Sequence, residues 1–353
     1  MQGINGNFYG VTFNGGGSID CESGCGTVFE ITPAGKLTTL HSFCSRHNCF
    51  DGYEPLPQLA LATNGRFYGT TIGGGAYHAG TVFEITPEGK LTTIYSFCSQ
   101  PNCTDGFQPT GGLVQATNGN LYGATYYGGT NCQNSGPPPG CGTVFEITPA
   151  GQLTTIYSFC SQPNCTDAPS QGVLVEATDG NFYGTTEGGG ANGNYGTVFE
   201  ITPAGQLTTL YSFCSELFCD DGWSTQPGLV QATNGNFYGT TYWGGYPRCS
   251  ENSNNGCGTM FSLSVGLAPF VKTLPGARIV GGEVGILGGS LTEASSVAFN
   301  GTSAQFTVKS PTLILAHVPI GATTGYVTVT TPSGVLRSNV PFQVIPQHRN
   351  QPR

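Results

Sequence analysis

A near-identical segment recurs along the chain and limits what the chain can fold into. Residues 26–33 read Gly-Thr-Val-Phe-Glu-Ile-Thr-Pro, and the segment begins again at Gly80, Gly142 and Gly196, with a weaker copy at Gly258. The spacing alternates between a shorter and a longer step. Recurrence at such a period is typical of solenoids, propellers and other arrays in which each repeat is one supersecondary unit.

Each full repeat contains four candidate strands joined by turns. In one copy they are residues 91–97, 112–117, 121–126 and 142–148. Asn-Gly, Pro-Ala-Gly and Pro-Glu-Gly between these β-rich segments indicate tight turns. The alternation over residues 27–32 places apolar side chains on both faces of a strand, so each sheet must be stacked between others. Four short strands in a repeat of roughly 50 residues predict a β-propeller blade, since leucine-rich coils repeat every 20–30 residues or so.

The array has an irregular start. Residues 5–32 supply only the last two strands of a blade, and residues 270–274 lie where a further outer strand would fall. One hypothesis is that residues 270–274 close a ring by completing the first blade. The other is that this blade stays open and takes a strand from another molecule.

Fourteen cysteines lie between Cys21 and Cys257, and none follows. An even count in local pairs predicts disulfides formed in an oxidising compartment. Zinc is the competing interpretation, but it needs recurring His or Cys partners, and the five histidines do not recur. The predicted disulfides are Cys21–Cys25, Cys44–Cys49, Cys98–Cys103, Cys132–Cys141, Cys160–Cys165, Cys214–Cys219 and Cys249–Cys257.

The pattern changes after the last repeat. From about residue 271, short alternating strands separated by turns predict a small β-sandwich. The expected fold is therefore all-β: a β-propeller-like array of about five blades, the first incomplete, followed by an immunoglobulin-like sandwich. We assign residues 1–268 to the repeat domain, 269–345 to the sandwich and 346–353 to a polar tail.

Two resemblances rest on these segments. Over residues 3–265, the repeat Asn-Gly-Asn-Phe-Tyr-Gly-Thr-Thr with Gly-Thr-Val-Phe-Glu-Ile-Thr-Pro resembles the choice-of-anchor tandem repeat (GloVer) family of exported bacterial proteins. Residues 275–345 are similar to IPT/TIG immunoglobulin-like domains, through segments 297–302, 318–325 and 327–334. The first resemblance implies surface export and supplies no catalytic residues. The second implies a spacer or a binding module.

Charge is scarce. Only 9% of the residues are charged, against about 25% in a typical domain. Sparse charge leaves sheets weakly protected against self-association. The net charge of −9 and the 11 scattered basic residues exclude nucleic acid as a partner, and no apolar segment has membrane-spanning length. We expect a secreted or cell-surface protein, bound to itself, to surface or matrix components or to glycans. Its targeting segment is expected to lie outside this sequence.

Acidic residues recur from repeat to repeat. Glu30, Glu84, Glu146 and Glu200 occupy one strand position. A catalytic carboxylate is needed once or as one pair, so this repetition predicts a structural role, such as accepting hydrogen bonds from a neighbouring blade.

A second set of carboxylates follows the Cys-x4-Cys loops. Asp51, Asp105 and Asp221 each precede a glycine, and Asp167 holds the same place before Ala168. An Asp-Gly turn and a calcium ligand both fit this position, and calcium is the one cofactor that the sequence leaves open.

Aromatic residues gather on alternate repeats. Repeats one, three and five carry an extra cysteine-bounded loop and place aromatic or amide residues before Gly-Gly, where repeats two and four have Ile72 and Glu187. Such loops predict a contact surface for sugars or another subunit; the alternative is that the rings cover the disulfides. The candidate residues are Phe13, Tyr126, Tyr127, Tyr242, Trp243 and Trp223.

No Ser/His/Asp, Cys/His or Gly-x-Ser-x-Gly arrangement is recognisable in the sequence. The leading prediction is a non-enzymatic extracellular structural or adhesion protein. In its sharper form the protein assembles into a filament or surface layer through strand or loop exchange. The alternatives are a lectin-like propeller and a glycan-active hydrolase or lyase with a propeller core.

Overall fold

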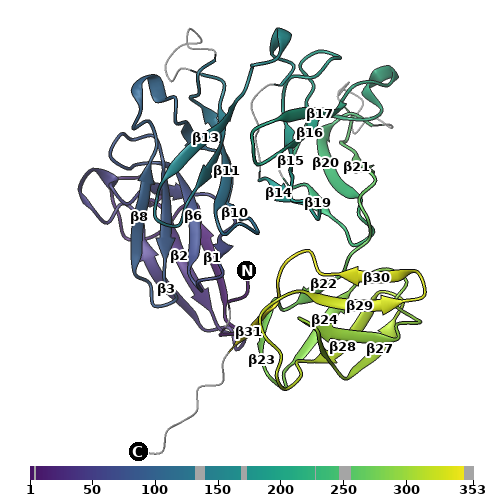
Figure 1. Cartoon of the computed structure of the whole chain (residues 1–353). Coiled ribbons are helices and arrows are strands. Elements are labelled where there is room, and N and C mark those ends of the chain that lie inside the picture. Colours follow the sequence, from purple (N-terminus) through teal and green to yellow (C-terminus); the bar gives the residue numbers. More distant parts are fainter. Residues whose placement is uncertain (4, 132–139, 168–172, 227, 246–255, 346–353) are drawn as a thin grey trace, which may run out of the picture. The chain divides into compact units, whose positions relative to one another are not determined.

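The computed structural model describes residues 1–345 apart from 4, 132–139, 168–172, 227 and 246–255, so the predicted tail lies outside the described residues. The chain is all-β and forms two compact units, one mainly from residues 6–262 and the other mainly from the residues after 262 (Figure 1). The described residues contain no helix that is long and apolar enough to cross a bilayer.

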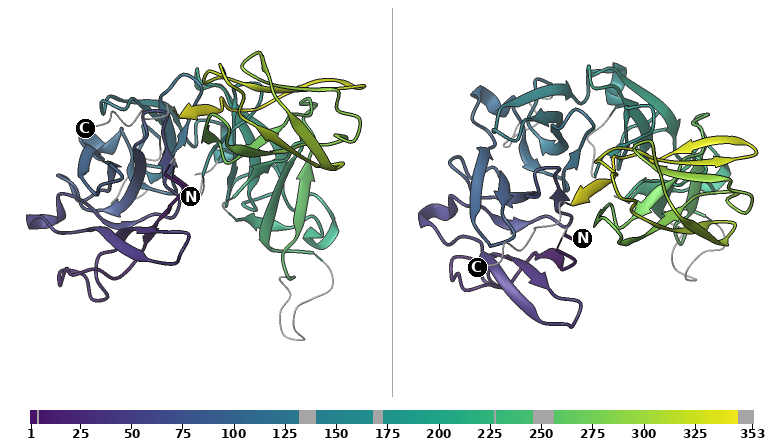
Figure 2. Two further views of the ribbon diagram at one scale, coloured as in Figure 1. Left: turned by 90° about the horizontal axis from the view of Figure 1, so that it is seen from below. Right: turned by 60° about the horizontal axis from the view of Figure 1, so that its bottom comes forward.

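The first unit contains five antiparallel sheets, numbered here in chain order; their strands follow one another along the colour ramp in Figure 2. Sheet 1 contains β1 (Phe8–Thr12), β2 (Thr27–Ile31) and β3 (Leu37–Ser42). Sheet 2 contains β4 (Tyr53–Pro55), β5 (Ala60–Leu61), β6 (Phe67–Gly73), β7 (Thr81–Ile85) and β8 (Leu91–Ser96). Sheet 3 contains β9 (Phe107–Pro109), β10 (Val114–Gln115), β11 (Leu121–Tyr127), β12 (Thr143–Ile147) and β13 (Leu153–Ser158). Sheet 4 contains β14 (Val175–Glu176), β15 (Phe182–Thr186), β16 (Thr197–Ile201) and β17 (Leu207–Ser212). Sheet 5 contains β18 (Trp223–Thr225), β19 (Val230–Gln231), β20 (Phe237–Trp243) and β21 (Met260–Leu263).

The boundaries between sheets differ from the predicted ones by one strand. The strand that reads Leu-Thr-Thr closes a sheet rather than opening the next one, because the Pro-Glu-Gly segment folds β8 back onto β7 as a hairpin. Its turn is held by the N–H of Gly89, which donates to the Thr86 carbonyl at 2.9 Å. Sheet 1 therefore has three strands instead of the predicted two. Met1 adds a bridge by exchanging two hydrogen bonds with Tyr9, at 2.7 and 2.8 Å.

Residues 270–274 do not complete the first sheet. β22 (Lys272–Leu274) pairs with β24 (Glu283–Leu287) in the second unit, so the closure hypothesis is wrong. The sheet that lacks an outer strand is sheet 5. In the part of the chain that the structure describes, β21 pairs with β20 alone. Pro269 and the missing Leu-Thr-Thr segment explain this, since proline cannot donate to a ladder.

The five sheets stack through two different faces, as the apolar pattern predicts. In sheet 2 the first, which we call the Phe face, carries Leu59, Phe67, Phe83, Ile85 and Leu91, and it packs against Tyr9, Val28 and Phe43 of sheet 1. The second, which we call the Tyr face, carries Ala60, Tyr68, Val82 and Phe97, and it packs against Leu121, Phe145 and Ile147 of sheet 3. The same arrangement joins sheets 3 and 4.

One ring contact recurs at all four junctions. A phenylalanine that follows the outer strand of one sheet meets a phenylalanine in the next sheet edge-on, with centroids 5.0–5.9 Å apart. The pairs are Phe43–Phe83, Phe97–Phe145, Phe159–Phe199 and Phe213–Phe261.

The Tyr-Gly step of each repeat is explained by the same rings. The Phe83 ring lies over Gly69, where a Cβ would come within 2.5 Å of the ring carbon Cζ. Gly123 lies under Phe145 in the same way, at 2.7 Å. The absence of a side chain at these glycines lets the phenylalanine ring pack directly against the backbone of the adjacent strand.

The second unit has two four-stranded antiparallel sheets, ordered β22-β24-β28-β27 and β26-β25-β29-β30, with β23 parallel to β31. Val284, Ile286 and Ile314 from the first sheet share a core with Val297 and Phe299 from the second. The remaining strands are β23 (Ala277–Ile279), β25 (Ser296–Phe299), β26 (Thr302–Ser303), β27 (Phe306–Ser310), β28 (Leu313–His317), β29 (Val327–Thr331), β30 (Gly334–Arg337) and β31 (Gln343–Ile345).

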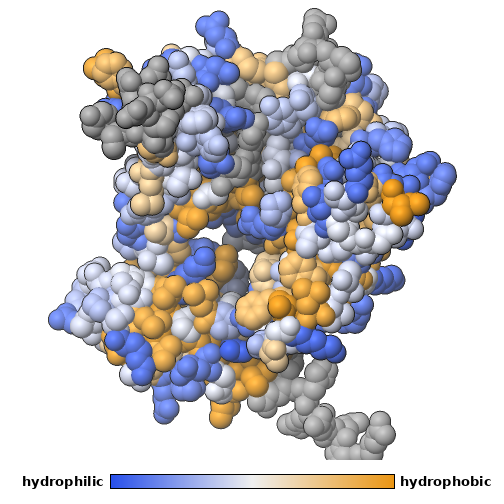
Figure 3. Space-filling model, turned by 180° about the vertical axis from the view of Figure 1, so that it is seen from behind, coloured by the Kyte–Doolittle hydropathy of each residue, from blue (hydrophilic) through white to orange (hydrophobic). Residues whose placement is uncertain are grey.

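The surface reflects the composition. In the view of Figure 3, apolar and weakly polar residues interrupt the hydrophilic ones over both units. This fits a chain in which only 9% of the residues are charged.

Candidate functional site

Disulfides brace the loops of the first unit. The predicted bonds Cys21–Cys25, Cys44–Cys49, Cys98–Cys103, Cys160–Cys165 and Cys214–Cys219 are confirmed. Cys141 and Cys257 are also disulfide-bonded, while their predicted partners Cys132 and Cys249 lie outside the described residues.

Four of these loops share one fold. Each Cys-x4-Cys segment contains a single 3-10 turn: His47–Cys49, Pro101–Cys103, Pro163–Cys165 or Leu217–Cys219. The middle residue of each turn is left-handed, with φ between 56° and 61°. Asparagine tolerates this conformation and fills it three times, whereas the fourth loop has Phe218.

An aspartate organises each of these loops. The carboxylate of Asp105 accepts hydrogen bonds from the Tyr95 hydroxyl (2.7 Å), from the Ser99 N–H and hydroxyl (both 2.8 Å) and from the Gln100 N–H (3.2 Å). Its side chain is buried, at 3% exposure. Asp51, Asp167 and Asp221 accept the same set of bonds in their own loops, with His41 in place of tyrosine at Asp51.

At Asp51 and Asp221 these contacts favour the ionised carboxylate. Burial opposes the charge of Asp51, but hydrogen bonds from His41 and Ser45 outweigh it and lower the pKa. Burial also opposes the charge of Asp221, and bonds from Ser215 and Tyr211 again lower the pKa. Calcium needs oxygen acceptors around it, so at the calcium candidates Asp51, Asp105 and Asp221 an ion would have to displace donors that the fold already uses.

The recurring glutamates also have structural partners, but in their own sheets rather than in a neighbouring one. Glu146 accepts hydrogen bonds from the side chains of Asn120 (2.6 Å) and Tyr122 (2.7 Å), which lie on or beside the adjacent strand. Burial and this bond raise the pKa of Tyr122 to about 12. Glu30, Glu84 and Glu200 accept equivalent bonds within sheets 1, 2 and 4.

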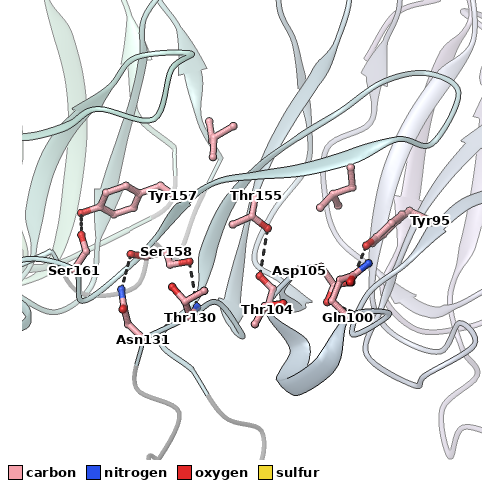
Figure 4. A pocket seen from close by; sticks show the side chains of 12 residues that line it. Tyr95, Gln100, Thr104, Asp105, Thr130, Asn131, Thr155, Tyr157, Ser158 and Ser161 are labelled. Carbon is pink, nitrogen blue, oxygen red and sulfur yellow. Dashed lines mark hydrogen bonds between the residues drawn. The ribbon is translucent and has the colours of Figure 1, made fainter.

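A polar hollow of about 610 Å³ lies beside β8 and β13 (Figure 4). Most of its lining residues carry a hydroxyl, amide or carboxylate group, and several of these groups hydrogen-bond to neighbouring residues, while Leu153 and Ile156 add apolar surface. Thr155 donates to the Thr104 carbonyl at 3.3 Å, and the Asn131 amide donates to the carbonyls of Ser158 and Phe159 at 3.1 and 3.0 Å. These bonds fix the walls of the hollow and reduce the number of groups that could hold a ligand.

Four aromatic rings gather on sheet 5 and the adjoining loop of sheet 4. This aromatic cluster consists of Tyr195, Trp223, Tyr242 and Trp243. The two indoles are stacked, with centroids 5.9 Å apart and planes at 27°. Tyr242 meets Trp243 edge-on at 4.5 Å, and Tyr195 meets Trp223 edge-on at 5.8 Å. Tyr242 is 55% exposed and Tyr195 36%, so the cluster presents ring surface to solvent.

Backbone geometry holds the cluster in place. Trp223 and Trp243 are register partners across β18 and β20. Ser224 beside them has a left-handed φ of 55°, a conformation that costs roughly 1–3 kcal/mol outside glycine. Its N–H donates a hydrogen bond to the Tyr195 carbonyl at 2.9 Å. This bond holds the loop of sheet 4 next to the strand that carries Trp223.

The other predicted aromatic residues lie at related positions. In sheet 3, Phe107 pairs with Tyr127, with centroids 6.3 Å apart, and Tyr126 meets Tyr127 edge-on at 4.5 Å. In sheet 2 the partner of Tyr53 is Gly73, so no second ring is present. Phe13 follows β1 and is 43% exposed.

Sequence reasoning missed Phe107 and Tyr195, which complete these groups. Phe107 is in a three-residue strand too short to show alternation, and Tyr195 is in a loop. One signal in the sequence could have found Phe107. Tyr53, Phe107 and Trp223 each stand two residues before a Pro or Thr, with a polar residue between. The alternative role of covering the extra disulfides concerns Cys21–Cys25, Cys132–Cys141 and Cys249–Cys257, of which Cys132 and Cys249 lie outside the described residues.

The family model of the Gloeobacter/Verrucomicrobia repeat matches residues 1–136 and 132–283. No curated protein matches the chain. Solved structures similar to it include a fungal AA5-family alcohol oxidase in complex with copper (11% identity, TM-score 0.38, covering 98% of this chain and 84% of that one). A sucrose-6-phosphate hydrolase from Lactobacillus gasseri (10%, 0.38, 98% and 85%) and a luciferin-regenerating enzyme (10%, 0.40, 72% and 78%) are also similar. These TM-scores are too low for an inference about function.

Proposed function

We propose that this chain, which belongs to the Gloeobacter/Verrucomicrobia repeat family, is a non-enzymatic extracellular adhesion protein. In this proposal it binds glycans through its aromatic cluster. The observation that carries the proposal is the stacked pair Trp223–Trp243, flanked by the exposed ring of Tyr242. A sugar ring has an apolar face of C–H groups, which stacks on aromatic rings, and a rim of hydroxyls, which needs polar neighbours. Glu187, bonded to the Ser224 hydroxyl at 3.4 Å, is one such neighbour.

The extracellular location is supported by the disulfides. Five bonds are present in the described residues, and disulfides form and persist in oxidising compartments. A non-enzymatic role is supported by the recurring carboxylates, because those of Glu146 and Asp105 are occupied by hydrogen bonds within the fold.

In this proposal the sheets of the first unit are β-propeller blades, and the second unit is an immunoglobulin-like domain of the IPT/TIG type. Support for the first part comes from sheets of about four strands stacked face to face. Support for the second comes from two antiparallel sheets around one core. The second unit would then act as a spacer or as an additional binding module.

Tryptophan fluorescence tests glycan binding directly, because the only two tryptophans of the chain belong to the aromatic cluster. Soluble polysaccharides that represent bacterial, plant and animal surfaces are titrated into the protein, and glycan binding is measured in parallel by calorimetry. We expect a saturable change in tryptophan emission with at least one glycan class.

Trp243→Ala should weaken that binding by at least about tenfold, since buried aromatic anchors dominate such interfaces. Tyr77→Ala is the matched control, because Tyr77 is 52% exposed and is not part of the aromatic cluster; it should bind as the parent does. The proposal fails if no glycan class changes the emission, or if Trp243→Ala binds as tightly as the parent.

A further inference from the structure

The extra cysteine-bounded loop of sheet 3 ends beside a Cys-x4-Cys loop. β12 and β13 are antiparallel, with Thr143 opposite Ser158. The same register, continued by two residues beyond both strands, places Cys141 opposite Cys160. Because both cysteines are disulfide-bonded, two disulfides meet at this point.

Three sulfur atoms come together there. The Sγ atoms of Cys141, Cys160 and Cys165 all lie within 4.8 Å of one another. The Phe159 N–H donates to the Gly142 carbonyl at 3.0 Å, which holds the two segments side by side. Cys160 and Cys165 are bonded to each other, so the disulfide of Cys141 runs to a cysteine outside this group. All three sulfurs are oxidised, and none is a thiolate that could bind a metal ion.

Sheets 2 and 4 have the same Cys-x4-Cys loop with a different residue at this position. Their strand registers, continued in the same way, place Ala79 opposite Cys98 and Tyr195 opposite Cys214. A single cysteine at one position of the strand ladder therefore brings a second disulfide to the loop of sheet 3. The loops of sheets 2 and 4 are matched comparisons within the same chain.

Solvent access distinguishes sheet 3 from sheet 1. In sheet 1 the continued register places Cys25 opposite Cys44, but these residues are only 0% and 5% exposed. Cys141, Cys160 and Cys165 are each partly exposed. A small molecule in solution therefore has access to the sulfurs of sheet 3, whereas those of Cys25 and Cys44 are covered.

We propose that Cys141, Cys160 and Cys165 form a thiol–disulfide exchange site whose co-reactant is a small thiol. The thiolate of the small molecule attacks the sulfur bonded to Cys141, forms a mixed disulfide there and releases the Cys141 thiolate. That thiolate attacks Sγ of Cys160. The Cys141–Cys160 bond forms as the Cys160–Cys165 bond breaks, and the electron pair leaves on Cys165. Two disulfides and one thiolate are present before and after, so the exchange consumes no oxidant or reductant.

The fold favours the second step of this exchange. The three sulfurs are held together, so the attack of the Cys141 thiolate is intramolecular and needs no collision with a further thiol. The loop also keeps its anchor when its own disulfide opens, because the Asp167 carboxylate accepts hydrogen bonds from the N–H groups of Ser161 and Gln162, both at 3.0 Å. The exchange therefore changes the connectivity of the cysteines without unfolding the loop, and it does not depend on glycan binding.

A variant that frees Cys141 tests the exchange without any added thiol. Cys132→Ser removes the predicted partner of Cys141. The variant is held at pH 8, near the ordinary thiol pKa of about 8.5, and free thiols are then blocked with N-ethylmaleimide. Peptic digestion in acid, where thiols are protonated and exchange stops, and mass spectrometry locate the label. At least about a tenth of the label should lie on Cys160 or Cys165, as for an exchange that is uphill by no more than about 1.4 kcal/mol.

The matched control is Cys249→Ser, which removes the predicted partner of Cys257. No Cys-x4-Cys loop follows Cys257 in the sequence, so the label should stay on Cys257. Circular dichroism compares both variants with the parent, and the label distribution should not change with protein concentration, because the exchange is intramolecular. A folded Cys132→Ser variant that carries its label on Cys141 alone overturns the proposal.

The parent protein decides the matter even if the variant does not fold. It is treated with a limiting amount of glutathione at pH 8, blocked and mapped in the same way. We expect a Cys141–Cys160 or Cys141–Cys165 bond together with glutathione on the former partner of Cys141. The comparison loop Cys98–Cys103 should give only its own two cysteines, free or joined to glutathione. The absence of both new bonds in the parent, while the Cys98–Cys103 loop does react, would sink the proposal and would leave the tryptophan titration with glycans unaffected.

Discussion

Trp223 and Trp243 are register partners on β18 and β20, and their rings lie 5.9 Å apart with planes only 27° from parallel. Two indoles at this separation couple their electronic transitions. We predict an exciton couplet in the far-ultraviolet circular dichroism spectrum of the parent protein. Trp223→Phe and Trp243→Phe should each abolish the couplet, whereas Tyr77→Phe should leave it unchanged. A couplet that survives either tryptophan replacement would contradict the stacking.

Gly69→Ala should destabilise the protein by about 1–3 kcal/mol, the usual cost of overpacking a core. The added Cβ would lie 2.5 Å from Cζ of Phe83, whose ring is held between two sheets. Chemical denaturation measures the loss. Gly289→Ala, where no atom lies within 4 Å of the added Cβ, is the matched control. Combining Gly69→Ala with Phe83→Leu should cost less than the sum of the two changes, because leucine vacates the space that the new methyl needs.

Phe218→Asn should stabilise the protein by about 1 kcal/mol, because it relieves a bulky residue from a left-handed conformation that asparagine adopts readily. Phe218 has φ 61° and is 85% exposed, so little packing is lost. The reverse exchange, Asn102→Phe, should lower the free energy of unfolding by a similar amount. Equal stabilities for Phe218→Asn and the parent would show that the loop relaxes around the aromatic residue.

Acid should weaken the fourth disulfide loop through Asp221. Its pKa is lower in the folded chain than in the unfolded chain, so the stability it contributes is present above the unfolded value of about 3.9 and is lost as the pH falls through the folded pKa. Asp221→Asn should be less stable at neutral pH by about 1–2 kcal/mol, and its stability should fall less steeply on acidification. Calorimetry between neutral pH and pH 2 or so tests this. Asp220→Asn, the exposed neighbour, should follow the parent curve.

Replacing Cys98 and Cys103 together by serine should lower the free energy of unfolding by about 2 kcal/mol, the loop-entropy value for a short crosslink. The loop should keep its shape at low temperature, because Asp105 still binds Ser99 and Gln100. Amide exchange at Ser99 and Gln100 measures whether that is so. Fast exchange at both amides would mean that the disulfide, and not the aspartate, organises the loop.

Much of this architecture was readable from the sequence. The recurring Gly-Thr-Val-Phe-Glu-Ile predicts an inner strand of sheets 1 to 4, and alternation predicts the stacking on both faces. Local cysteine pairs predict the disulfides that the structure confirms. These features depend on neighbours in the chain, so a pattern along the sequence is enough to find them.

The features that were missed depend on pairing between segments. The sheet frame shifted by one strand because Pro-Glu-Gly reads equally well as a boundary and as a hairpin turn. One of the two hypotheses for residues 270–274 placed them in the first sheet, although the partner of β22 is β24. Tyr195 joins the aromatic cluster through its ring contact with Trp223 and through the hydrogen bond from the Ser224 N–H to its carbonyl, and no local pattern predicts such contacts.

The recurring junction has a consequence for how such a chain can change over time. At each junction among sheets 1 to 4, the Tyr face of one sheet packs against the Phe face of the next. An in-frame duplication or deletion of a repeat therefore creates no new kind of contact between sheets. The number of repeats can change while the residues at each junction stay the same. A loop such as the one that carries Phe218 can diversify in one copy without cost to the others.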